Sequence, residues 1–164
     1  SFFDTKEHLS IVSNTKIHVS GAFNNRETIS NALTTTLSIA TASGNVTGSW
    51  AGSGNYELAG GTRTLNAGFT LPATGNLNIS SGSLDFNTGG AFTLSTAAVN
   101  LSGGTLTGSD ALTITNAFIW TGGTLSGTGL LTTNGTSTLN NATSLPLTRT
   151  WTNAATGTAN WDQG

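Results

Sequence analysis

Cysteine and methionine are both absent from this chain of 164 residues. Without cysteine there is neither a disulfide framework nor a thiolate metal site. Because both residue types are prone to oxidation, their absence is compatible with an exposed, extracellular location. No apolar run approaches the ~18 residues of a membrane helix, and none has the apolar core of a signal peptide. We therefore expect no insertion into a membrane.

Charge is equally scarce, since Asp, Glu, Lys and Arg make up 7% of the residues and the net charge is −2. Binding to phosphates needs clustered Lys and Arg, whereas the five basic residues are spread along the chain. This argues against nucleic acid as a partner. Ser, Thr, Gly and Asn supply more than half of the chain, and recurring apolar pairs distinguish this composition from that of a disordered protein.

What the chain does contain is a repeat, clearest over residues 92–135. One pattern occurs there twice, with an offset of about 19 residues. A period near 20 with Gly-Gly turns and short alternating strands is typical of a solenoid in which each coil is one repeat. The equivalent positions are Val99 and Phe118, Leu101 and Trp120, Leu106 and Leu125, and Leu112 and Leu131.

Apolar residues two positions apart recur through the chain from residue 69 onward. This spacing places both side chains on one face of a strand, while the Thr, Asn or Ser between them faces outward. Glycines separate the pairs where the chain must turn sharply. The sequence thus predicts an all-β protein, a parallel β-helix with about 19–22 residues per coil. The pairs include Phe69/Leu71, Leu77/Ile79, Leu84/Phe86, Phe92/Leu94, Val99/Leu101 and Leu112/Ile114.

The segment 1–32 differs from the rest, because half of the charged residues lie before Thr28. A first coil exposes its apolar interior and a row of unpaired backbone groups, so it needs a cover. We predict that residues 1–32 form an N-terminal cap and that residues 33–164 form the β-solenoid. An alternative is that residues 1–32 are an extended arm that adds as a strand to a neighbouring subunit.

The segment WTGGTLSGTGLLTTNGTSTLNN (residues 120–141) resembles the Ser/Thr/Gly/Asn-rich repeats of large bacterial surface proteins. These are the adhesin and autotransporter passengers of the filamentous-haemagglutinin type. The segments RTLNAG at Arg63 and RTWTNA at Arg149 are similar to the Arg-Thr-Leu-type segments of those repeats. The resemblance covers residues 60–164. It implies a right-handed parallel β-helix, displayed at the cell surface or secreted, that acts as a stalk or an adhesive surface without shared catalytic residues.

Enzymes built on β-helices need several carboxylates close together, often with a basic residue or Ca²⁺. Asp85 and Asp110 are separated by more than one predicted coil, so they need not stack. The segment GGTLTGSD (103–110) resembles a calcium-binding nonapeptide only loosely, and a structural turn explains it better. His8 and His18 have no third ligand nearby in the sequence. We expect no enzyme activity, no metal site and no cofactor.

Outward polar residues of successive coils offer the best candidate surface. The predicted period places Thr93 and Ser95 beside Thr113 and Thr115, and these beside Thr132 and Asn134. This ladder resembles those of ice-binding β-solenoids, and a solenoid that binds glycans or ice is the alternative function. Trp161 is the tryptophan that we expect to be most exposed, for a ligand or for assembly. Trp120 replaces Leu101 in the next coil, so we expect it to fill the core.

The C-terminal sequence RTWTNAATGTANWDQG has no charged cover comparable with that of residues 1–32. An uncovered last coil is a template for another strand. We therefore expect either continuation in a longer chain or end-to-end self-association into filaments, with host or surface glycans as further candidate partners. Because the chain begins at Ser1 without an initiator Met, we expect a processed product or a fragment.

Overall fold

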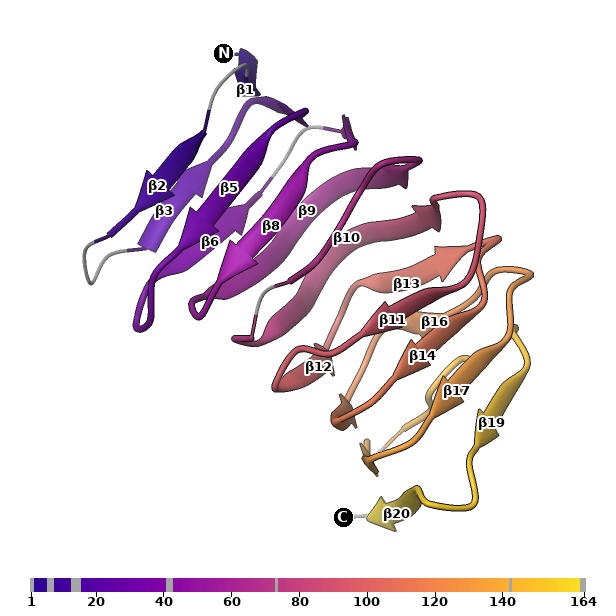
Figure 1. The fold of residues 1–164 in the computed structure, drawn as a ribbon. Helices are drawn as coiled ribbons and strands as arrows, with labels where there is room; N and C mark the ends of the chain where they lie inside the picture. The colour runs from indigo at the N-terminus through magenta and orange to yellow at the C-terminus, as the bar shows by residue number, and fades with distance from the viewer. Residues whose placement is uncertain are drawn as a thin grey trace.

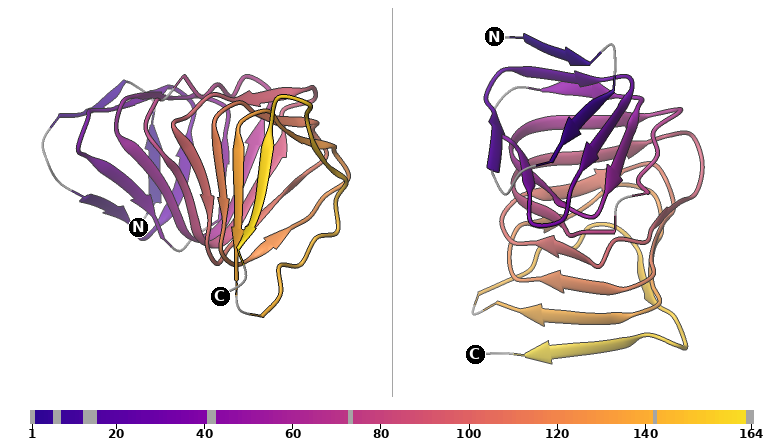
Figure 2. Two further views of the ribbon diagram at one scale, coloured as in Figure 1. Left: turned by 90° about the horizontal axis from the view of Figure 1, so that it is seen from below. Right: turned by 60° about the vertical axis from the view of Figure 1, so that its left-hand side comes forward.

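The structure is a computed structural model that describes residues 2–5, 8–12, 16–40, 43–72, 74–141 and 143–162. These residues form a β-solenoid of about seven turns, with no helix. Short strands lie on three sides of the tube, which we call walls 1, 2 and 3 in chain order. The two ends of the chain lie at opposite ends of the tube (Figures 1 and 2).

Neighbouring strands of a wall pair in parallel, except that wall 2 is divided into a three-stranded and a four-stranded sheet, with only an isolated bridge between Ser49 and Thr70 in the interval. Wall 1 contains β1 (Phe2–Thr5), β4 (Ala22–Asn25), β7 (Gly44–Val46), the second halves of β9 (Asn55–Asn66) and β10 (Leu77–Asn87), β13 (Thr105–Gly108) and β16 (Thr124–Leu125). Wall 2 contains β2 (Leu9–Ile11), β5 (Thr28–Asn31), β8 (Ser49–Gly52), β11 (Phe92–Leu94), β14 (Leu112–Ile114), β17 (Leu131–Thr133) and β19 (Trp151–Asn153). Wall 3 contains β3 (Lys16–Val19), β6 (Thr36–Ile39), the first halves of β9 and β10, β12 (Ala98–Leu101), β15 (Ala117–Trp120), β18 (Thr136–Asn140) and β20 (Thr158–Asp162).

Strand register confirms the predicted coil length. Leu77 pairs with Val99 in the next coil, and Val99 pairs with Phe118 in the one after, so these two steps span the predicted range of coil lengths. The strands of wall 2 lie nearest the viewer in Figure 1 and run toward the lower left, while β3 and β6 behind them run the opposite way. Because the chain also advances toward the lower right in Figure 1, its coils wind in a right-handed sense. The predicted right-handed parallel β-helix is therefore confirmed.

Walls 1 and 3 join where β9 and β10 bend. The register between these two strands shifts on either side of Ser81. Gly61 and Gly82 have φ values of 68° and 74° at the bend, a backbone conformation that side chains other than glycine resist. A Cβ on Gly82 would also lie 2.2 Å from the Gly61 carbonyl oxygen. Glycine at position 82 thus lets two coils stack closely at this corner.

One hydrophobic core fills the tube, because the alternate residues of every wall point inward in columns. The Leu101 column of wall 3 consists of Ile39, Leu58, Ile79, Leu101, Trp120 and Leu139, each at most 3% exposed. The prediction that Trp120 fills the core is therefore confirmed. Nearer the N-terminus, Trp50 stacks on Tyr56 at 5.1 Å between ring centroids. Burial raises the pKa of the Tyr56 hydroxyl, whose oxygen lies 2.7 Å from the Ile29 carbonyl oxygen and 2.8 Å from the Ala51 carbonyl oxygen, so these two acceptors share its single proton.

Strand pairing runs without a break across residue 32. The strands β1, β2 and β3 already pair in parallel with β4, β5 and β6 of the next coil, and Ala32 donates its backbone N–H to the carbonyl oxygen of Ile11. The described part of the segment 1–32 is thus built as coils of the same solenoid. That this first coil covers the end of the tube stays a prediction.

Candidate functional site

The structure brings together six of the seven residues predicted to form a ligand or assembly surface. Thr93, Thr113 and Thr132 are in direct register on β11, β14 and β17, and Thr152 on β19 continues the row. Ser95, Thr115 and Asn134 each follow the last residue of these same strands, which aligns them in a second row. We call these two rows the wall 2 ladder.

The wall 2 ladder follows from strand alternation. Phe92 and Leu94 point into the core, so Thr93 between them is exposed. Thr115 also donates its hydroxyl to the Leu94 carbonyl oxygen at 3.2 Å, which fixes its side chain against the previous coil. The strands of wall 2 contain no Asp, Glu, Lys or Arg. The ladder is therefore an uncharged array of hydroxyl and amide groups.

Trp161, the seventh predicted residue, lies on a different wall. It is in register with Leu139 on β18, so it continues the Leu101 column in the last coil. Its side chain is 65% exposed, while Leu139 is 3% exposed. The exposure predicted for Trp161 is confirmed, and its physical reason is that no described coil follows β20.

A hollow of about 390 Å³ lies at the corner between walls 1 and 2, lined by Gly89, Gly90, Ala91, Ser109, Asp110 and Ala111. The Asp110 carboxylate is 4% exposed and accepts hydrogen bonds from Thr88 N at 2.6 Å, Thr88 Oγ1 at 2.7 Å and Gly89 N at 3.2 Å. Both of its oxygens thus hold the preceding corner in place. This is the structural turn that the sequence favoured over a calcium site.

The other candidate acids lie elsewhere. Asp85 is in register with Thr64 and Thr107 on wall 1 and is partly exposed, whereas Asp110 follows β13 at the corner. In the part of the chain that the structure describes, no three His, Cys, Asp or Glu side chains group closely enough to hold a metal ion. The same residues include no helix long and apolar enough to cross a membrane.

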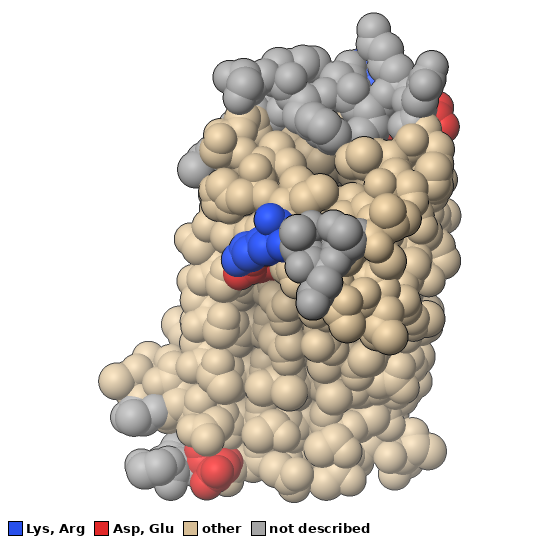
Figure 3. Space-filling view, turned by 90° about the vertical axis from the view of Figure 1, so that its left-hand side faces the viewer, with Lys and Arg blue, Asp and Glu red and all other residues tan. Residues whose placement is uncertain are grey.

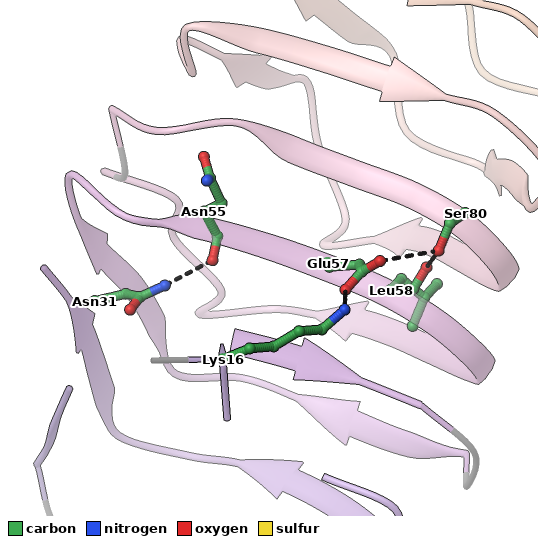
Figure 4. Close-up of polar contacts among 6 residues, drawn as sticks. All are labelled: Lys16, Asn31, Asn55, Glu57, Leu58 and Ser80. Carbon is green, nitrogen blue, oxygen red and sulfur yellow. Dashed lines mark hydrogen bonds and ion pairs between the residues drawn. The ribbon is translucent and has the colours of Figure 1, made fainter. Parts of the chain in front are cut away.

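An ion pair on wall 3 joins two coils that are not adjacent (Figure 4). Lys16 Nζ lies 2.6 Å from Glu57 Oε2, although the strand β6 lies between β3 and β9. Ser80 Oγ donates to Glu57 Oε1 at 3.4 Å from the following coil. Burial alone would raise the pKa of Glu57, and the contacts with Lys16 and Ser80 outweigh it, so the pKa lies below its ordinary 4.5. Most of the described residues on the face shown in Figure 3 are uncharged.

We expect this ion pair to make stability sensitive to acid. A carboxylate with a lowered folded pKa stabilises the fold above its unfolded pKa and stops doing so as pH falls through the folded value. Between pH 5 and 3, the free energy of unfolding should fall less for Glu57→Gln than for the parent. The difference should be about 1 kcal/mol or less, because the ion pair is partly exposed. Urea midpoints measured across this pH range test it. Asp85→Asn, on wall 1, is the control and should lose stability in acid as steeply as the parent does. If Glu57→Gln also loses stability as steeply as the parent, the expectation is wrong.

Two arginines lie inside the tube. Arg63 is 0% exposed and its guanidinium carbon lies 5.8 Å from the centroid of the Phe23 ring, across the gap left by Gly44. Burial lowers the pKa of Arg63 to about 10, so it is charged at neutral pH. Arg149 is 4% exposed and donates to the carbonyl oxygens of Gly129 and Asp110, at 2.8 and 2.9 Å.

The similar segments at Arg63 and Arg149 do not occupy equivalent positions. Arg63 is in register with Leu84, and that column continues through Leu106 and Leu125 to Leu147. Arg149 lies two positions beyond Leu147, so the two arginines belong to different columns. The sequence echo is thus not a structural repeat.

Comparison with known proteins finds no matching family model, no matching curated protein and no matching solved structure. The resemblance to surface-protein repeats therefore rests on the motifs at residues 63–68, 120–141 and 149–161.

Proposed function

We propose that this chain is a non-enzymatic structural module of an extracellular stalk or fibre at a cell surface. The observation that carries the proposal is that one parallel sheet runs without a break from β1 to β20 beside one continuous core. A solenoid can be extended along its axis one coil at a time. Each coil contacts only its neighbours, so an added coil does not alter the earlier ones. With about seven turns and a spacing of about 4.8 Å between strands, the module adds roughly 34 Å to such a rod.

The chemistry of the acidic side chains supports a structural role. Glu57 pairs with Lys16, and Asp110 uses both oxygens to hold the Thr88–Gly89 corner. A general acid and base pair needs two carboxyl groups that face one bound substrate. These carboxylates instead stabilise contacts between coils. Surface motifs similar to those of adhesin repeats favour the same role outside the cell.

Immunogold labelling of intact source cells tests the proposed location and role. An antiserum raised against the purified chain should label projecting material on cells that have not been permeabilised. The same serum, adsorbed beforehand with the purified chain, is the control. Label that appears only after permeabilisation would overturn the proposal.

The wall 2 ladder favours a second candidate function, the binding of a glycan or of ice. Its rows are uncharged, and adjacent hydroxyls repeat at the strand spacing of about 4.8 Å. A regular array of this kind suits a ligand that presents its own repeating hydroxyl groups or ordered waters. The array has no exposed aromatic side chain on β11, β14 or β17 to stack on a sugar ring.

We expect Thr113→Glu to abolish any activity of the wall 2 ladder, because it places a charge in the middle of the array. Glycan-array binding and thermal hysteresis are the two measurements. Thr138→Glu, which faces outward on wall 3, is the matched control and should behave as the parent does. If the parent is inactive in both assays, or if Thr113→Glu retains full activity, the ladder is not a binding face.

A further inference from the structure

The corner between β17 on wall 2 and β18 on wall 3 contains a pair of residues that occurs once in the chain. Asn134 is the only asparagine that is followed by glycine. In such a pair the side-chain amide carbon lies within reach of the next backbone nitrogen, and glycine has no side chain to hinder the approach. Attack by this nitrogen closes a five-membered ring, and proximity strongly favours an intramolecular reaction of this kind. Asn134 is therefore the asparagine of this chain that is chemically most prone to react.

Stacking of the coils requires the glycine of this pair. A Cβ on residue 135 would lie 2.1 Å from the carbonyl oxygen of Asn116 in the preceding coil, and 2.6 Å from its carbonyl carbon. Atoms that are not bonded cannot approach so closely, so no larger residue fits between the two coils at this point. The packing of the corner thus excludes the side chain that would shield the Asn134 amide.

Hydrogen bonds hold the backbone on either side of the pair but leave the reacting groups free. Asn134 donates its backbone N–H to the Ile114 carbonyl oxygen at 2.9 Å, and the Gly135 carbonyl oxygen accepts from the Thr158 N–H at 3.2 Å. Within the described part of the chain, neither the Gly135 N–H nor the Asn134 side-chain amide has a hydrogen-bond partner. Both residues are partly exposed, so water and hydroxide reach them.

Asparagines in the neighbouring coils are held by their side chains. Asn116, one coil earlier, donates its amide to the carbonyl oxygens of Ser95 and Thr96 at 3.2 and 2.9 Å. Asn153, one coil later, donates its amide to the Gly157 carbonyl oxygen at 2.9 Å. Each of these amides must break its hydrogen bonds before it can turn toward the following nitrogen, and each precedes alanine instead of glycine.

We propose that Asn134 is a site of spontaneous modification, at which the Gly135 backbone nitrogen attacks the Asn134 side-chain amide. The nitrogen loses its proton and forms a bond to Cγ, the bond from Cγ to Nδ2 breaks, and the side-chain nitrogen leaves as ammonia. Water then opens the resulting cyclic imide at one of its two carbonyl carbons. The product is aspartate at position 134, or isoaspartate, in which the main chain runs through the side-chain carbon. The reaction needs only this corner and water, so it is independent of the proposed function.

Either product adds one negative charge to the wall 2 ladder, of which Asn134 is a member. The new carboxylate lies beside Thr115 of the preceding coil, in an array that is otherwise uncharged. Isoaspartate also lengthens the main chain by one atom between the hydrogen bonds to Ile114 and Thr158. We expect the Thr158 N–H to exchange roughly tenfold faster in that product, because its hydrogen bond to the Gly135 carbonyl oxygen is weakened.

Incubation of the folded chain in water enriched in heavy oxygen, followed by peptide mapping with mass spectrometry, tests the proposal. The peptide that contains Asn134 should gain one heavy oxygen atom and one negative charge. Its rate of conversion should rise roughly tenfold per pH unit above neutral pH, because the attacking nitrogen must lose its proton. Asn134→Thr is the matched variant and should gain no charge at this position. It should fold as the parent does, since Thr115 occupies the equivalent position one coil earlier.

The same incubation in urea distinguishes the folded corner from the bare sequence, with circular dichroism melts to show which samples are folded. Asn134 should react in the folded chain at a rate within about tenfold of its rate in urea, because no hydrogen bond has to break first. Asn116 should stay intact in the folded chain. An Asn134 that stays intact in the folded chain, or that reacts there much more slowly than in urea, would overturn the proposal. Conversion of Asn116 at the same rate as Asn134 would overturn it as well.

Discussion

Leu101→Asp should leave the chain largely unfolded at room temperature. Leu101 is 0% exposed in the middle of the tube, between Ile79 and Trp120 of the neighbouring coils. The substitution removes a packed side chain and buries a charge without a partner, which together cost about 4 kcal/mol or more. Folded domains are typically stable by only about 5–15 kcal/mol.

Ile119→Asp is the matched control for this prediction. Ile119 lies on the adjacent strand β15 but faces outward and is 36% exposed. The same chemical change there should alter stability by about 0.5 kcal/mol. Circular dichroism melts and urea titrations compare the two variants. A β-rich spectrum and a melt like that of the parent for Leu101→Asp would contradict the inward placement of its column.

The fold could be predicted from the sequence because its main determinant is local. Apolar residues two positions apart, as in Leu112 and Ile114, specify one face of a strand, and their recurrence at the period of the repeat specifies the coil. The same alternation fixes the outer face, so the alignment of Thr93, Thr113 and Thr132 also follows from the sequence. The number of residues per coil was the only further quantity needed to predict that these rows align.

Contacts that depend on the lengths of particular coils could not be predicted. Lys16 and Glu57 are joined across two coils of slightly different length, and a single insertion or deletion in either coil would move them apart. The clearest sequence repeat is the step from Leu101 to Trp120. More residues separate Leu139 from Trp161 than separate that pair, so the alignment of Trp161 with Leu139 could not be predicted from the repeat.

The two buried arginines are the clearest omission of the sequence reasoning. The sequence analysis assigned no position in the fold to either arginine, yet Arg63 has the inward phase of its neighbour Leu65. That spacing of two was the available signal. Arg149 had no such signal, because its burial depends on a reach across two coils to Asp110.

Replacing each buried arginine with methionine should change stability in opposite directions. Arg149 satisfies the carbonyl oxygens of Gly129 and Asp110, so Arg149→Met leaves buried acceptors unpaired and should cost about 2–3 kcal/mol. Arg63 donates one hydrogen bond, to the Thr62 carbonyl oxygen, and its Nε and Nη2 have no hydrogen-bond partner. Arg63→Met removes a charge from an apolar column and should stabilise the fold by about 1 kcal/mol or more.

The pKa of Arg63 gives the pH range in which this difference is fully present. Its folded value of about 10 lies below its ordinary 12.5 because burial disfavours the charged form. The cost of burying the charge therefore applies in full below pH 10 and shrinks as pH rises above it. Urea midpoints at neutral pH should rise for Arg63→Met and fall for Arg149→Met.

Hydrogen exchange distinguishes a local effect of Arg149 from a global one. Because Arg149 joins the last coil to the corner two coils earlier, its replacement should raise exchange first in β19 and β20, while the coils around Leu58 and Ile79 keep their protection. Arg63→Met should leave β19 and β20 unchanged, since it acts near the other end of the tube. Two results would contradict this account: equal destabilisation by both substitutions, or unaltered exchange in β19 and β20 of Arg149→Met. Either would show that the hydrogen bonds of the guanidinium group do not determine which buried arginine stabilises the solenoid.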